Sequence, residues 1–152
     1  MINTEFKSVV DKDKYEVYIF RGKLAFPLNI AVHTWIVINN KGKIDRWDLL
    51  SPHRRPEKKY GYIHKNVLKP TSWFYKELED NKLIGKVEGL IAKETINFIE
   101  KNILNYPYKN RYSYFPGPNS NTFTQWILNN NPKVKIKLPF RAIGKCYAKK
   151  IK

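Results

Sequence analysis

Three segments in the first third of the chain have the composition of β-strands. Residues 15–20 are rich in aromatic and β-branched side chains, residues 31–38 are strongly apolar, and residues 44–50 follow the turn as the returning strand. Residues 39–42, Asn-Asn-Lys-Gly, are of types that favour a tight turn. We therefore predict strands over these three ranges and expect the second and third strands to form a β-hairpin.

Helical spacing of apolar residues is clearest between residues 84 and 104, which predicts a helix that Pro107 ends. A second helix is expected from about Ser120 to about Asn129, directly after a segment rich in proline. The sequence thus predicts two helices in its C-terminal half.

Other segments complete the predicted architecture. Residues 51–59 contain two prolines and four basic side chains, which is typical of an exposed loop, and residues 60–64 are a candidate short strand. Residues 133–138 alternate strictly between lysine and an aliphatic side chain, which predicts a further strand. We expect an α+β fold in which a small, mostly antiparallel sheet packs on one or two helices.

Length and composition narrow the class of protein. The chain has 152 residues, of which 42% are hydrophobic and 14% aromatic, so we expect residues 1–152 to form a single domain with a packed core. It contains neither an apolar run long enough to cross a membrane nor the apolar middle of a secretory signal. Cys146 is the single cysteine, which excludes an internal disulfide and a multi-cysteine zinc site. We expect a soluble, cytoplasmic protein without a metal or an organic cofactor.

The chain is strongly basic, with a formal net charge of +16. Residues 101–152 contain eleven basic residues and no acidic one. Such a segment can attract an anionic partner, either a nucleic acid or a membrane surface. Alternatively, the excess of lysine over arginine and the abundance of asparagine and isoleucine reflect the codon bias of an AT-rich genome.

Candidate catalytic groups are few. His33 lies within an apolar strand, where a histidine can be held rigidly as a general base, although a buried structural histidine is the alternative. Ser120 lies at the predicted start of a helix, where backbone N–H groups can stabilise an oxyanion, although capping of the helix also explains it. Asp48, on the strand that follows His33, is our candidate for orienting the imidazole. The alternative is that Asp48 occupies an exposed position of the hairpin.

Further residues are expected around the same cleft. Trp35 shares the strand face of His33 and would form a wall of the cleft if that face lines one. The alternative for Trp35 and the other tryptophans is core packing. The remaining residues that we expect at the substrate or the cleft are Trp47, His64, Asn119 and Asn121.

Residues 117–123, with Trp126 after them, carry a resemblance to a known family. The sequence Gly-Pro-Asn-Ser-Asn-Thr-Phe resembles an uncharacterised bacterial domain of unknown function that is marked by this segment. The resemblance includes the sequence from His33 to Trp35 and covers about residues 15–147. It indicates kinship but implies no activity.

A more distant similarity concerns residues 119–123. They are similar to the Asn-Cys-x-x-Phe segment of circularly permuted papain-like enzymes, such as the lecithin–retinol acyltransferase group, in which a strand histidine precedes the nucleophile. The similarity implies a permuted papain-like fold and a hydrolase or acyltransferase that acts on an amide or ester of a small molecule, a peptide or a lipid. Ser120 would be the nucleophile, with His33 as general base.

This chain has serine at position 120 where those enzymes have cysteine, so two outcomes are open. Either Ser120 and His33 form a working pair that Asp48 orients, or the domain is non-catalytic, and it binds a ligand in the cleft without turnover or has a structural role. A third hypothesis is a nucleic-acid-binding module, in which tyrosines from Tyr106 onward stack on bases while lysines follow phosphates.

Overall fold

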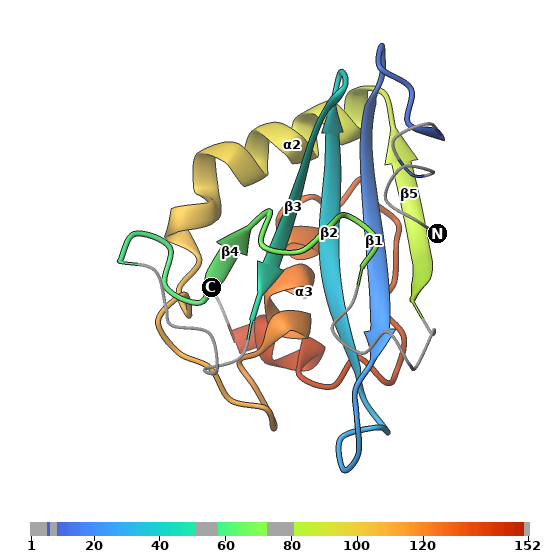
Figure 1. The fold of residues 1–152 in the computed structure, drawn as a ribbon. Helices are drawn as coiled ribbons and strands as arrows, with labels where there is room; N and C mark the ends of the chain where they lie inside the picture. Colours follow the sequence, from blue (N-terminus) through green and yellow to red (C-terminus); the bar gives the residue numbers. More distant parts are fainter. Residues whose placement is uncertain (1–5, 7–8, 51–57, 73–80, 151–152) are drawn as a thin grey trace.

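The structure is a computed structural model that describes residues 6, 9–50, 58–72 and 81–150. Its strands form a five-stranded antiparallel sheet in the order β4-β3-β2-β1-β5 (Figure 1). The fold is therefore α+β, as the sequence predicts. The elements are β1 (Tyr15–Lys23), β2 (Val32–Asn40), β3 (Lys43–Leu49), β4 (Ile63–Lys65), β5 (Lys82–Glu88), α2 (Leu90–Asn102), η2 (Ile103–Asn105), α3 (Ser120–Asn130) and η3 (Lys145–Lys150).

The predicted hairpin is confirmed as β2 and β3. Asn40 pairs with Lys43, so only Lys41 and Gly42 form the turn. Both have a positive φ, 50° for Lys41 and 93° for Gly42, which is the conformation of a two-residue hairpin turn. The register that follows from this turn fixes which side chains of β2 and β3 lie side by side.

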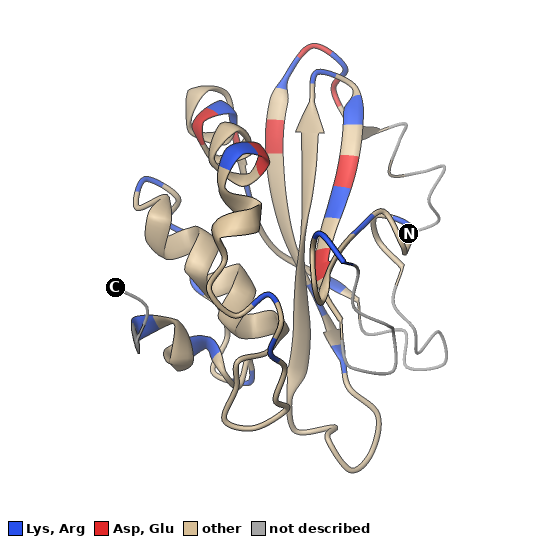
Figure 2. Ribbon diagram, turned by 90° about the vertical axis from the view of Figure 1, so that its left-hand side faces the viewer, with Lys and Arg blue, Asp and Glu red and all other residues tan. Residues whose placement is uncertain are grey.

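The two faces of the sheet have different coverings. On one face, Ile36 and Ile38 belong to a core that also contains Ile99 of α2 and Phe123 of α3. On the other face, Trp35 packs in a separate cluster that includes residues preceding β1. Figures 1 and 2 show both helices on the first face, and Figure 1 shows residues 66–72 crossing the second. None of the described helices has the length and apolar character needed to cross a membrane.

The predicted helix over residues 84–104 is wrong in its first part. Residues 82–88 form the edge strand β5, which pairs with β1, and the helix begins only at Leu90. Ile84 and Val87 are spaced for a helix but also fit a partly buried edge strand. Gly89 separates the two elements with φ 70° and ψ −138°, a conformation that a continuing helix excludes.

The predicted strand over residues 133–138 is also wrong, although its alternation is real. Val134 and Leu138 are buried and the three lysines are exposed, yet the segment belongs to no strand of the described sheet. Ile136 packs against Gly85 of β5, where an added Cβ would come within 2.8 Å of its Cγ1. Burial on one side is enough to produce the alternation without a hydrogen-bonded ladder.

The other predicted elements agree with the structure where it describes them. The second helix is confirmed as α3, and the predicted strand over residues 60–64 corresponds to the short strand β4. Of the predicted loop over residues 51–59, residues 51–57 lie outside the described residues, whereas Lys58 and Lys59 are exposed.

The substitution Gly89→Ala distinguishes this strand–helix junction from a continuous helix. At φ 70° and ψ −138°, alanine is strained, and we expect a loss of about 1–3 kcal/mol in the free energy of unfolding, measured by urea denaturation. Apart from the neighbouring residues of the chain, no atom of the described residues lies within 4 Å of the added Cβ, so backbone strain determines the result. A gain of about 1 kcal/mol would instead indicate a helical glycine and contradict the junction.

Candidate functional site

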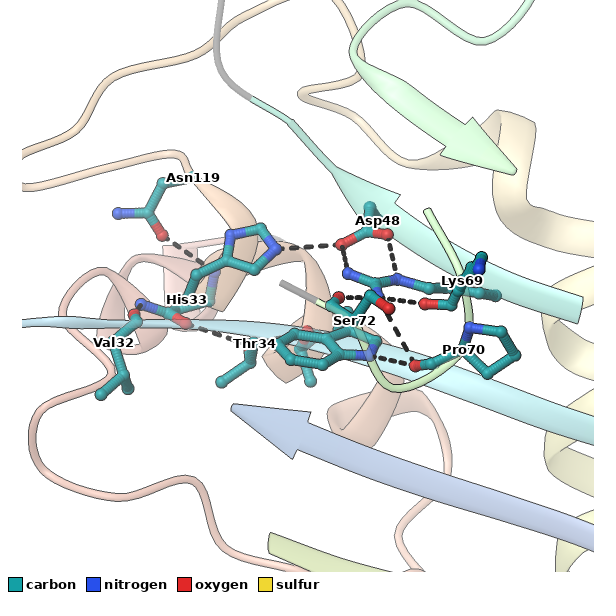
Figure 3. A network of polar contacts seen from close by, with 12 residues as sticks. Val32, His33, Thr34, Asp48, Lys69, Pro70, Ser72 and Asn119 are labelled. Atoms are coloured by element: carbon teal, nitrogen blue, oxygen red, sulfur yellow. Dashed lines mark hydrogen bonds and ion pairs between the residues drawn. The ribbon is translucent and has the colours of Figure 1, made fainter. Parts of the chain in front are cut away.

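A buried hydrogen bond joins the predicted base to its predicted orienting residue. His33 Nε2 lies 3.0 Å from Asp48 Oδ1, and both side chains are almost fully buried (Figure 3). An ionised carboxylate only accepts hydrogen bonds, so the proton of this bond belongs to Nε2. In the neutral imidazole, Nδ1 then carries the lone pair and is the nitrogen that can accept a proton.

Arg46 is the residue of this network that the sequence reasoning missed. Its guanidinium forms a bidentate pair with Asp48, with Nε 2.6 Å from Oδ2 and Nη2 3.1 Å from Oδ1. Nη1 donates to the carbonyl oxygens of Lys69 and Ser72, and the guanidinium lies 4.2 Å from the centre of the Trp35 ring system. Arg46 is two residues from Asp48 on β3, so both lie on one face. That spacing of opposite charges is the signal that could have revealed the pair.

Burial and neighbouring charges set the protonation states. Burial lowers the pKa of His33 below its ordinary value of 6.5, and the charge of Arg46 adds to this effect, while Asp48 opposes it without cancelling it. Burial alone would raise the pKa of Asp48, but the hydrogen bond from His33 and the Arg46 guanidinium bring it below its ordinary value of 3.8. Near neutral pH, the site therefore holds an ionised Asp48 and a neutral His33.

The polar residues around Ser120 have structural partners. Asn119, rather than Ser120, caps α3, since its side chain accepts hydrogen bonds from the backbone N–H groups of Asn121 and Thr122. Asn121 Nδ2 donates to the carbonyl oxygens of Val32 and Ile143, 2.8 Å from each. Thr122 Oγ1 donates to Gly144 O at 2.8 Å. These bonds fix the start of α3 against the first residue of β2 and against the C-terminal segment.

His33 and Ser120 line the same cavity. It has a volume of about 200 Å³, and most of its wall is apolar. Its polar lining includes Asn119 and Asn121, so four of the predicted site residues lie together. In the described part of the chain, the Ser120 hydroxyl forms no hydrogen bond, so it is not bonded to His33 here. The lining residues are Leu24, Leu28, Ile30, Ala31, Val32, His33, Tyr112, Tyr114, Phe115, Asn119, Ser120, Asn121 and Ile143.

The other predicted cleft residues lie elsewhere among the described residues. Trp35 is fully buried over the Arg46 guanidinium, and its Nε1 donates to Pro70 O at 2.8 Å. Trp47 belongs to the core on the helix side of the sheet. His64 is buried and is the cross-strand neighbour of Asp48 on β4. Trp35 and His64 therefore surround the His33–Asp48 pair rather than the cavity.

The depressed pKa of His33 predicts how stability depends on pH. The unfolded state, with a histidine pKa near 6.5, takes up a proton at a higher pH than the folded state. The contribution is therefore fully present above about pH 6.5 and is lost as the pH falls toward the folded-state pKa, with a slope approaching about 1.4 kcal/mol per pH unit. Asp48 contributes a separate loss that begins only near its unfolded value of 3.8.

Urea unfolding of the wild type and of His33→Gln at several pH values between about 7 and 5 tests this expectation. The variant should lack the histidine contribution to the slope. Parallel pH profiles for the two proteins would show that His33 is not held neutral by the fold.

Comparison with known proteins identifies the family but no activity. No curated protein matches the chain, and no solved structure matches it. The model of one protein family, described as "Protein of unknown function (DUF3750)", matches residues 14–147. This range includes His33, Asp48 and Ser120. The chain therefore belongs to the DUF3750 family of proteins of unknown function.

Proposed function

We propose that this protein is a serine-dependent hydrolase or acyltransferase that acts on an ester or amide. The main support for this proposal is that the His33 and Ser120 side chains line the same cavity. A neutral histidine held by a buried carboxylate lines it, and so does a serine at the first position of a helix. A nucleophile, a base and a residue that orients the base are the parts that acyl transfer through serine requires.

The protonation state of His33 suits serine better than cysteine. A thiol enzyme works as a thiolate paired with a charged imidazolium, which the depressed pKa of His33 disfavours. Serine remains protonated until attack and requires a neutral imidazole as general base. The serine at position 120 and the lowered pKa of His33 are therefore chemically consistent with each other.

The proposed reaction proceeds in two steps. His33 Nδ1 takes the proton of the Ser120 hydroxyl while Oγ forms a bond to the carbonyl carbon of the substrate. His33 then returns the proton to the leaving alcohol or amine as its bond to carbon breaks, which leaves an acyl group on Ser120. Water, or a second alcohol or amine, attacks this acyl group with His33 again acting as base. Ser120 recovers its proton in this step.

The first turn of α3 is suited to stabilise the oxyanion. The backbone N–H of Ser120 belongs to the same residue as the attacking Oγ and is the candidate donor to the oxyanion. The backbone N–H groups of Asn121 and Thr122 instead donate to the Asn119 side chain. The positive end of the helix dipole adds to this effect, and no acidic residue in the first turn opposes it. The mostly apolar wall of the cavity favours a substrate whose acyl portion is apolar, within the broader class of small molecules, peptides and lipids.

One observation favours a second candidate, a cavity that binds a ligand without turnover. The Ser120 hydroxyl forms no hydrogen bond to His33, and the surrounding asparagine and threonine side chains serve the structure. Catalytic hydrogen bonds often tighten only when substrate is bound, so the catalytic proposal requires this closure. Chemical labelling of the protein separates the two candidates.

A fluorophosphonate with an alkyl chain is the appropriate probe, because it forms a covalent bond only with an activated serine. We expect one adduct, located on Ser120 by peptide mass spectrometry, and none in Ser120→Ala. His33→Gln should slow labelling by about 100-fold or more, since it removes the base. Ser113→Ala is the matched control and should label normally, because the Ser113 side chain donates a hydrogen bond within its own loop, to Phe115 O.

Ser120→Ala should also keep its stability within about 1 kcal/mol, because its hydroxyl forms no hydrogen bond with the described residues. Absence of an adduct on wild-type Ser120, or equal labelling of wild type and His33→Gln, would contradict the catalytic proposal. A stable, unlabelled protein that still binds an apolar ligand would instead support the second candidate.

A further inference from the structure

Three separate loops each present a phenylalanine to solvent beside a proline. Phe26 precedes Pro27 in the β1–β2 connection, Phe115 precedes Pro116 before α3, and Phe140 follows Pro139 before η3. Their side chains are 87%, 75% and 86% exposed, respectively. Several large apolar side chains that are exposed to solvent and lie close together indicate an interaction surface.

These loops gather around the mouth of the cavity that contains Ser120. Leu28 and Ile30 from the first loop and Phe115 from the second line that cavity directly. The third loop is tied to the first by Arg141, whose Nε donates to Ile30 O at 2.9 Å. We call the exposed apolar side chains of the three loops the apolar rim: Phe26, Leu28, Ile30, Tyr114, Phe115 and Phe140.

The segments that carry the apolar rim contain basic residues and no acidic ones. Residues 24–31, 106–119 and 137–145 contain no acidic residue. They contain five basic ones, namely Lys109, Arg111, Lys137, Arg141 and Lys145. In Figure 2 the acidic residues of the described chain lie in the upper part and the middle of the view, away from the loops at the lower end.

We propose that the apolar rim docks onto an anionic lipid bilayer, with the three phenylalanines entering the headgroup region and the basic residues meeting the lipid phosphates. Aromatic and aliphatic side chains flanked by lysine and arginine are the combination that binds such a surface. A bilayer fits better than a protein partner. The apolar side chains lie on separate loops around an open cavity. Because lipid chains are fluid, they can cover this uneven surface and also fill the cavity.

This inference rests on the proposed function in one respect only. Docking by the apolar rim would place the mouth of the Ser120 cavity against the membrane, so that an apolar acyl group could enter it from the lipid. The binding itself depends on the apolar rim and the basic residues, and not on Ser120. Membrane binding and turnover can therefore fail independently.

Sedimentation of the full chain with vesicles tests the docking. We expect binding to vesicles of equal parts phosphatidylglycerol and phosphatidylcholine, weaker binding at high salt, and much weaker binding to pure phosphatidylcholine. The triple variant Phe26→Ser, Phe115→Ser and Phe140→Ser should bind at least about tenfold more weakly. It should fold normally because the three side chains are exposed.

Two controls separate the apolar rim from other causes. The triple variant Val9→Ser, Leu83→Ser and Leu90→Ser removes exposed apolar side chains outside the rim and should bind vesicles like the wild type. Ser120→Ala should also bind like the wild type, whatever the labelling experiment shows. The proposal is overturned if the wild type does not bind anionic vesicles, or if the triple phenylalanine variant binds them as tightly as the wild type does. Light scattering that shows a dimer of the wild type and a monomer of the rim variant also overturns it, because the rim would then be an interface between copies.

Discussion

The buried carboxylate of Asp48 is the group on which the candidate site depends. An isolated charge at this depth would be strongly unfavourable, so the fold must supply partners for it. Arg46 neutralises it with two hydrogen bonds, and His33 supplies a third. The remaining donors of Arg46 hold the carbonyl oxygens of Lys69 and Ser72, so the same charge pair also fixes residues 66–72 across the sheet. The Arg46–Asp48 pair therefore both orients His33, the base of the proposed reaction, and holds residues 66–72 over this face of the sheet.

What the sequence predicts correctly depends on short-range patterns. The hairpin of β2 and β3 follows from two predicted strands around the turn-forming residues 39–42. Its register in the structure brings Asp48 close to His33. The start of α3 follows from a run of capping residues after prolines, although the cap is Asn119 rather than Ser120. The predictions are wrong where contacts with segments distant in the sequence determine the secondary structure. The spacing of Ile84 and Val87 suits a helix, and only pairing with β1 makes this segment a strand.

The segment from Asn119 to Phe123 illustrates how structural and chemical roles divide within one motif. Asn119, Asn121 and Thr122 hold the helix start against β2 and the C-terminal segment, and Phe123 is fully buried in the core. Ser120 is the member whose side chain has no such structural bond among the described residues, and it faces the cavity that His33 also lines. This division favours a chemical role for Ser120, and it could not be read from the motif alone.

The protonation state of the His33 ring decides whether this histidine can act as the base of the proposed reaction. Long-range ¹H–¹⁵N NMR spectra of the ring nitrogens at about pH 7 distinguish the two neutral tautomers from the imidazolium. We expect a neutral ring with the proton on Nε2, donated to Asp48, and a lone pair on Nδ1. A charged imidazolium, or a neutral ring with its proton on Nδ1, would contradict it. His33 would then have no proton-accepting nitrogen at the position where the proposed reaction requires one.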